Sequence, residues 1–225
     1  YQANTTAGFS IATSTGNATN GATRGHGLGV VPHMVVVKNL TDAVKWYIYH
    51  HKNTAAPETE YLELNSTAAT TDQAGWDDTA PTSTLVTTSD GSEVNASGKS
   101  YAMYSWTGIQ GYSKFGSYIG NGNTPDNTFV YLGFKPAFII LKNSSSSGAW
   151  GLYSDKILGY NPANNPFTPN TTDTPNATYV IDMLSNGFKV KHADAQLGAS
   201  GATYVYMAFA SAPLVNSNGV PNNAR

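Results

Sequence analysis

The hydrophobic residues of this chain occur in short runs that are separated by polar stretches rich in Gly, Asn, Ser, Thr and Pro. No stretch has the apolar spacing of an amphipathic helix, and the many Thr, Val and aromatic residues favour strands. The pattern predicts an all-β chain of short strands joined by turns. The predicted strands are Phe9–Ser14, Met34–Lys38, Trp46–His50, Tyr61–Leu64, Thr84–Thr87, Tyr101–Trp106, Phe115–Ile119, Ala137–Lys142, Trp150–Tyr153, Tyr179–Met183, Phe188–Lys191 and Tyr204–Phe209.

Some of these runs do not alternate between apolar and polar positions. Met34–Val37 and Phe138–Leu141 are wholly apolar, and Tyr101–Trp106 has little polar content. Because side chains on a strand alternate between its two faces, a continuous apolar run indicates a strand that is covered on both sides. These runs are therefore predicted to lie in the core.

The chain also contains an internal repeat. Residues 16–52 recur, diverged but without gaps, as residues 120–156, and residues 96–101 recur as residues 199–204. One unit of roughly 100 residues is thus present twice. A residue found in both copies is expected to serve the shared fold. The identical pairs include Gly16 and Gly120, Asn17 and Asn121, Leu28 and Leu132, Pro32 and Pro136, Lys38 and Lys142, Asn39 and Asn143, Trp46 and Trp150, Tyr49 and Tyr153, and Tyr101 and Tyr204.

The repeat predicts two tandem antiparallel β-sandwiches of a jelly-roll or lectin-like kind. We place the first at residues 1–112, the second at residues 113–212 and an extended C-terminal tail at residues 213–225. The alternative is a single merged sandwich with internal pseudo-twofold symmetry.

Composition narrows the possible functions. Only 12% of residues are charged and the net charge is −2, which gives no reason to expect nucleic acid or an anionic membrane as a partner. Cysteine is absent, so disulfides and thiolate metal sites are excluded, and no apolar run approaches the roughly 18 residues of a membrane span. The Asn-x-Ser/Thr pattern is frequent, but in such a composition many matches arise by chance; they are Asn4, Asn17, Asn39, Asn65, Asn95, Asn143, Asn170 and Asn176.

Catalytic chemistry finds little support. A glycoside hydrolase needs two acidic groups across one cleft, yet the only glutamates are Glu58, Glu60, Glu63 and Glu93, all in the first copy. The first three are interpreted as solvated charges along a strand edge. No Gly-x-Ser-x-Gly elbow, phosphate-binding loop or dinucleotide fingerprint is present, and no histidine spacing suits zinc. We therefore predict no enzymatic activity, no cofactor and no metal.

Trp76, Asp77 and Asp78 are the candidate ligand-binding residues. Trp76 lies in a polar loop of the first copy and is not repeated. An exposed ring there would stack on a sugar or anchor a partner subunit, whereas the alternative is a ring that folds back to cap the sandwich. Asp72 lies in the same loop as Asp77 and Asp78, and three carboxylates in one loop weakly indicate a calcium site. Their spacing matches no dedicated calcium-binding loop.

The repeated segments also resemble a known family. They include Leu28–Pro32, Trp46–Tyr49, Tyr61–Thr67, Val94–Gly98, Leu132–Pro136, Ser185–Val190 and Gly198–Gly201. Their order, over about residues 9–212, is similar to the β-sandwich units of bacteriophage tail-fibre and virion-surface proteins, especially those of marine phages. The first copy departs from this pattern, because Ser89–Ser92 stands where the second copy has Asn-Gly-Phe-Lys.

The resemblance implies a non-enzymatic virion protein, in a tail fibre or appendage or as a head decoration, located on the particle surface. It implies other virion proteins as partners, a symmetric homo-oligomer with a trimer as the first expectation, and attachment to a host glycan. The second hypothesis is a carbohydrate-binding module of a cell-surface or secreted protein. Fold-level likeness does not by itself decide between them.

Overall fold

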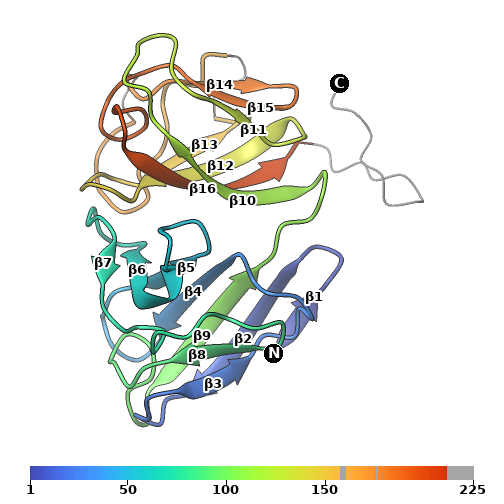
Figure 1. The fold of residues 1–225 in the computed structure, drawn as a ribbon, viewed down its shortest axis with the longest axis vertical. Coiled ribbons are helices and arrows are strands. Elements are labelled where there is room, and N and C mark those ends of the chain that lie inside the picture. Colours follow the sequence, from blue (N-terminus) through green and yellow to red (C-terminus); the bar gives the residue numbers. More distant parts are fainter. Residues whose placement is uncertain (158–160, 176, 212–225) are drawn as a thin grey trace. The chain divides into compact units, whose positions relative to one another are not determined.

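The computed structural model describes residues 1–157, 161–175 and 177–211. The predicted tail at 213–225 and the glycosylation motif at Asn176 lie outside these residues. The described chain is all-β, with antiparallel strands and one short 3-10 helix, η1 (Pro57–Thr59), and it contains no α-helix. It divides into two compact units, Tyr1–Gly108 and Ile109–Arg225 (Figure 1). The boundary expected after residue 112 falls just inside the second unit.

The first unit contains nine strands in two sheets. The larger sheet has the order β1-β2-β9-β4-β5-β6-β7, and the smaller one pairs β3 with β8. The strands are β1 (Gln2–Asn4), β2 (Phe9–Thr15), β3 (Ala22–Gly25), β4 (Met34–Asn39), β5 (Tyr47–His50), β6 (Glu60–Glu63), β7 (Thr71–Asp72), β8 (Leu85–Thr88) and β9 (Ser100–Trp106).

The second unit has a four-stranded sheet, β10-β16-β12-β13, and a three-stranded sheet, β11-β15-β14. Its strands are β10 (Ser113–Ile119), β11 (Phe129–Tyr131), β12 (Pro136–Asn143), β13 (Gly151–Ser154), β14 (Ile181–Leu184), β15 (Gly187–Val190) and β16 (Thr203–Ala210). In both units the sheets contribute to one hydrophobic core, an arrangement consistent with a β-sandwich.

The apolar strands are central and buried, as their sequence predicts. Val35 and Val37 of β4 enter the core of the first unit, and Met34 and Val36, which point to the other face, are also buried. All twelve predicted strands are present, with ends that differ by one or two residues. The structure adds four strands that were not predicted, namely β1, β3, β7 and β11.

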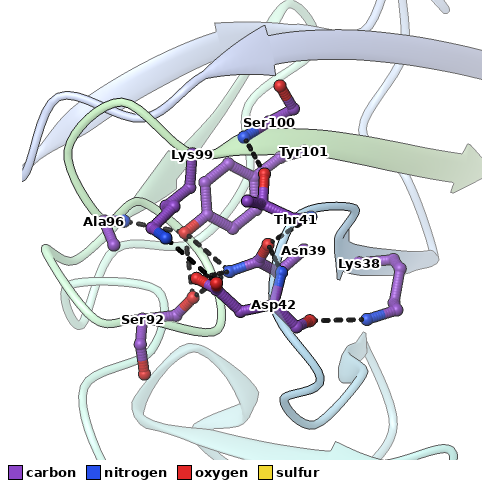
Figure 2. A network of polar contacts seen from close by, with 9 residues as sticks. All are labelled: Lys38, Asn39, Thr41, Asp42, Ser92, Ala96, Lys99, Ser100 and Tyr101. Atoms are coloured by element: carbon purple, nitrogen blue, oxygen red, sulfur yellow. Dashed lines mark hydrogen bonds and ion pairs between the residues drawn. The ribbon is translucent and has the colours of Figure 1, made fainter.

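A buried polar network joins the end of β4 to the loop before β9 (Figure 2). Asn39 Oδ1 accepts hydrogen bonds from the backbone N–H groups of Thr41 (2.8 Å) and Asp42 (2.9 Å). Asn39 Nδ2 donates to Ser92 O at 2.9 Å, and Tyr101 Oη donates to the same carbonyl at 2.8 Å. Because Asn39 is fully buried, these bonds replace the water that its amide loses on folding.

The second unit contains the same network at the end of β12. Asn143 Oδ1 accepts from the backbone N–H groups of Ser145 (2.9 Å) and Ser146 (3.0 Å). Asn143 Nδ2 donates to Ala195 O at 2.6 Å, and Tyr204 Oη donates to that carbonyl at 2.9 Å. Each unit thus ties a turn to a distant loop with one asparagine and one tyrosine.

Two glycines let the chain pass close to this network. A Cβ atom at Gly16 would lie 2.1 Å from Ala96 O, and one at Gly120 would lie 2.3 Å from Ala199 O. The backbone N–H of Gly98 donates to Gly16 O at 2.9 Å. Only glycine permits this backbone approach, which explains why this residue occurs at both positions.

Candidate functional site

Trp76 is not the exposed ring that its polar loop suggests. Its side chain is fully buried in the core of the first unit, where it meets Tyr49 edge-on with ring centroids 6.0 Å apart. Its Nε1–H donates to Glu60 O at 3.0 Å, which satisfies the indole donor inside the protein. A buried ring cannot stack on a sugar, so the expectation of an exposed platform is wrong and the capping alternative holds.

The two residues next to Trp76 in sequence, Gly75 and Asp77, line a pocket. This unit 1 pocket has a volume of about 230 Å³ and lies where three loops converge: the β2–β3 loop, the β7–β8 loop and the β8–β9 loop. Asp77 lines it, whereas Asp78 is exposed and does not. The lining residues are Asn20, Tyr47, Gln73, Ala74, Gly75, Asp77, Ser89, Asp90, Gly91, Glu93 and Val94.

The loops are held in place by local hydrogen bonds. The backbone N–H of Asp90 donates to Asn20 Oδ1 at 2.9 Å, which links two of the loops. The backbone N–H of Ser89 donates to Gly75 O at 3.1 Å and links the third. Asp77 and Asp78 have φ angles of 51° and 46°, a left-handed conformation that aspartate tolerates better than most residues. The pocket is therefore a feature of the folded backbone.

Tyr47 forms an inner wall of the pocket. Its ring stacks on Tyr61 with centroids 3.8 Å apart, and Tyr61 Oη donates to Gln73 Oε1 at 3.2 Å. Burial raises the pKa of the Tyr47 hydroxyl well above its usual range, and the hydrogen bond with Tyr61 and the charge of Glu93 act in the same direction. Tyr47 therefore presents a neutral hydroxyl beside the carboxylates.

The second unit has a pocket that shares one matched lining position with the unit 1 pocket. It has a volume of about 440 Å³ and is lined by Thr168, Asp173, Thr174, Pro175, Ala177, Tyr179 and Gln196. Ser92 O and Ala195 O accept the same pair of hydrogen bonds in their respective units, so the next residues, Glu93 and Gln196, occupy corresponding positions. Glu93 lines the unit 1 pocket and Gln196 lines the unit 2 pocket.

The other acidic residues do not assemble into a site. Glu63 was interpreted as a solvated edge charge, but it is buried and its Oε1 lies 2.5 Å from Lys45 Nζ. A buried carboxylate needs such a partner to offset the loss of hydration. Across the described ranges, no group of three His, Asp or Glu side chains is arranged to hold a metal ion. The same part of the chain has no helix long and apolar enough to cross a membrane.

Sequence reasoning found Asp77 but missed most of the pocket. Asn20, Gln73, Asp90 and Glu93 carry no local motif, and they come together only because three loops meet at one end of the first unit. One signal was available in the sequence: the predicted repeat aligns Glu93 with Gln196. If the two segments share one fold, a difference at an aligned position marks a residue that this fold does not require.

Comparison with curated proteins and with solved structures found no match. A family pattern, described as "Domain of unknown function (DUF7483)", matches residues 1–213 and so covers both units. The chain therefore belongs to the DUF7483 family.

Proposed function

We propose that this chain is a non-enzymatic structural protein of a virion surface, in a tail fibre or appendage or as a head decoration, with a role in attachment to the host. The observation that carries the proposal is that the recurring residues serve the framework. Asn39 and Tyr101, like Asn143 and Tyr204, are buried and hold loops in place. A chain that duplicates its framework while its loops diverge suits a scaffold that presents surfaces.

The proposal includes a duplication of one jelly-roll or lectin-like β-sandwich. The strand order β2-β9-β4-β5 in the first unit and β10-β16-β12-β13 in the second supports it. A further pair of hydrogen bonds supports it as well: the backbone N–H of Trp46 donates to Asn65 Oδ1 at 2.9 Å, and the backbone N–H of Trp150 donates to Asn170 Oδ1 at 2.8 Å. An experimental structure whose units do not superpose on these residues contradicts the duplication.

The virion role is tested on particles. Virions are purified from a virus whose genome encodes the chain, and mass spectrometry should detect the chain in a copy number that matches the particle symmetry. Antibody-gold labelling should place it on the particle surface. Sedimentation of the purified chain should show a symmetric oligomer, with a trimer expected. Absence from the particles, together with a monomer at high concentration, overturns the proposal.

A second candidate function is a carbohydrate-binding module of a cell-surface or secreted protein. The unit 1 pocket favours it, because hydrogen-bonding side chains from three loops line one depression. Binding of a glycan by a chain that is absent from virions would select this second role. Release of reducing ends from a bound glycan would instead show an enzyme, which uses two acidic groups; three acidic residues, Asp77, Asp90 and Glu93, line that pocket.

A further inference from the structure

We infer that the unit 1 pocket binds one ring of an uncharged saccharide, with Asp77, Asp90 and Glu93 accepting hydrogen bonds from its hydroxyl groups and with Asn20 and Gln73 at the rim. This assignment deepens the attachment role proposed above by naming the ligand class and the residues that hold it. It concerns the first unit alone.

The lining chemistry matches a polyol. The carboxylates of Asp77, Asp90 and Glu93 are acceptors, and the amide of Gln73 offers both donors and an acceptor. A sugar ring presents hydroxyl groups that both donate and accept, so it can satisfy acceptors that stand apart from one another. A volume of about 230 Å³ lies below the roughly 300 Å³ at which pockets for larger organic ligands begin, which suits a single ring.

Other ligand classes fit less well. Among the described residues, three acidic side chains and no Lys, Arg or His line the pocket, so a phosphate or carboxylate group is disfavoured there. A divalent cation needs several carboxylates on one point, and among the described residues no three acidic or histidine side chains are so arranged. Stacking on Tyr47 is also closed, because Gly75 and Tyr61 pack against its ring. Recognition therefore relies on hydrogen bonds.

The unit 2 pocket supports the inference that a binding pocket at this position is a property of the fold of each unit. Loops of different sequence leave a depression beside Glu93 in one unit and beside Gln196 in the other. The acceptor-only carboxylate of Glu93 is replaced there by an amide, which also donates. The two pockets are thus expected to differ in the saccharides that they accept, and Glu93→Gln converts the first toward the second.

The test uses the complete chain and a pocket-filling variant. The heavy atoms nearest to a Cβ atom at Gly91 would be Ser89 Oγ at 3.5 Å, Glu93 Oε2 at 3.7 Å and Val94 Cγ2 at 3.8 Å, so a Cβ atom fits at ordinary contact distances. Gly91→Leu is therefore chosen to place a larger side chain in the pocket. Ala80→Leu, on an exposed part of the neighbouring loop, is the matched control. Binding of glucose, galactose, mannose and N-acetylglucosamine is followed by NMR, with glucuronic acid and putrescine as charged probes.

We expect at least one uncharged sugar to shift the amide signals of Asp90 and Glu93. Gly91→Leu should weaken that binding at least about tenfold, Glu93→Gln should weaken it several-fold, and Ala80→Leu should leave it unchanged. The absence of any sugar-dependent shift, binding unaffected by Gly91→Leu, or equal binding of putrescine overturns the assignment. Thermal melting of each variant shows whether it is folded. A chain that is found on virions but binds no sugar defeats this site alone, whereas a sugar-binding chain that is absent from virions defeats only the virion role.

Discussion

Asn39 and Asn143 show how much of this fold depends on single amides. Each side chain is fully buried, accepts from two backbone N–H groups in the next turn and donates to a carbonyl more than fifty residues away in sequence. A buried backbone group that loses such a partner keeps the cost of its lost hydration. The two asparagines should therefore contribute similarly to stability in their own units.

We predict that Asn39→Ala and Asn143→Ala each lower the free energy of unfolding by about 2–4 kcal/mol, because several buried groups lose their partners at once. Urea denaturation followed by tryptophan fluorescence measures the change. Asn123→Ala, at an exposed position, is the control and should change stability by less than about 0.5 kcal/mol. A large cost at Asn39 with none at Asn143 would argue against a shared framework.

His26 is a buried histidine whose two ring nitrogens are both occupied. Its Nδ1 accepts from Leu28 N–H at 3.3 Å, so Nε2 carries the proton and faces Thr82 O at 3.2 Å. Burial lowers the pKa of His26 below its usual 6.5, and burial together with Lys52 lowers that of His33. In the acid range the unfolded chain therefore binds protons before the folded one does.

This gives a pH prediction. The neutral histidines contribute fully to the free energy of unfolding above about pH 6.5, which is the pKa of histidine in the unfolded chain. This contribution is lost as the pH falls below that value toward the lower pKa of the folded state. His26→Gln keeps one donor and one acceptor but does not titrate. Melting temperatures at pH 7.5, 6.5 and 5.5 should fall more steeply for the wild-type chain than for His26→Gln. Parallel pH curves would show that His26 does not contribute.

At the scale of strands, the core was predictable and the edges were not. The apolar runs that became β4, β9 and β12 are read from hydrophobicity alone, because both of their faces are buried. The missed strands β1 and β7 are short and largely exposed, so backbone pairing rather than side-chain pattern defines them. Such strands leave no periodic signal in the sequence.

The candidate site was predictable only in part, for a related reason. Asp77 was expected in a binding loop and does line the pocket, but the exposure of Trp76 was misjudged. The polar residues that flank Trp76 in sequence predict that the loop backbone lies near solvent. They do not predict where the large ring packs, because burial of an aromatic ring outweighs the preference of its flanking residues for solvent. The partners Asn20 and Asp90 depend on loop convergence, which is a tertiary property.

Gly16 and Gly120 lie where two backbone segments approach closely, and this predicts that a larger residue destabilises each unit. Gly16→Ala and Gly120→Ala each place a methyl group within 2.3 Å of a carbonyl oxygen of the backbone, which cannot yield as a flexible side chain can. Each substitution should lower the free energy of unfolding by about 2 kcal/mol or more. Gly91→Ala, whose added methyl finds ordinary contacts, is the matched control and should be tolerated. Equal stabilities for all three variants would contradict this reading of the backbone.

At the scale of the whole molecule, each unit has a core of its own. The core of the first unit includes Trp76, Tyr101 and Met103, and that of the second includes Phe188 and Tyr204. Among the described residues, neither cluster includes a residue from the other unit. Each unit is therefore expected to fold independently.

Limited proteolysis tests that independence. Cleavage in the segment 108–113 should give two fragments that each retain β-rich circular dichroism and a cooperative thermal transition. Separate expression of residues 1–108 and 109–225 provides the same comparison without a protease. Fragments that lose cooperative melting when separated would favour a single merged sandwich.

The framework asparagines have a practical consequence for producing the protein. Asn39-Leu40-Thr41 and Asn143-Ser144-Ser145 both match the acceptor sequence for N-linked oligosaccharides. The residues of both matches serve the fold: the amide caps its turn, and the hydroxyls of Thr41 and Ser145 accept from the backbone N–H groups of Ser100 and Thr203. In a eukaryotic secretory host, a transferase acting on the nascent chain would attach a bulky, hydrated group to side chains that must later be enclosed. A bacterial cytoplasm, which lacks that enzyme, is the suitable place to make it.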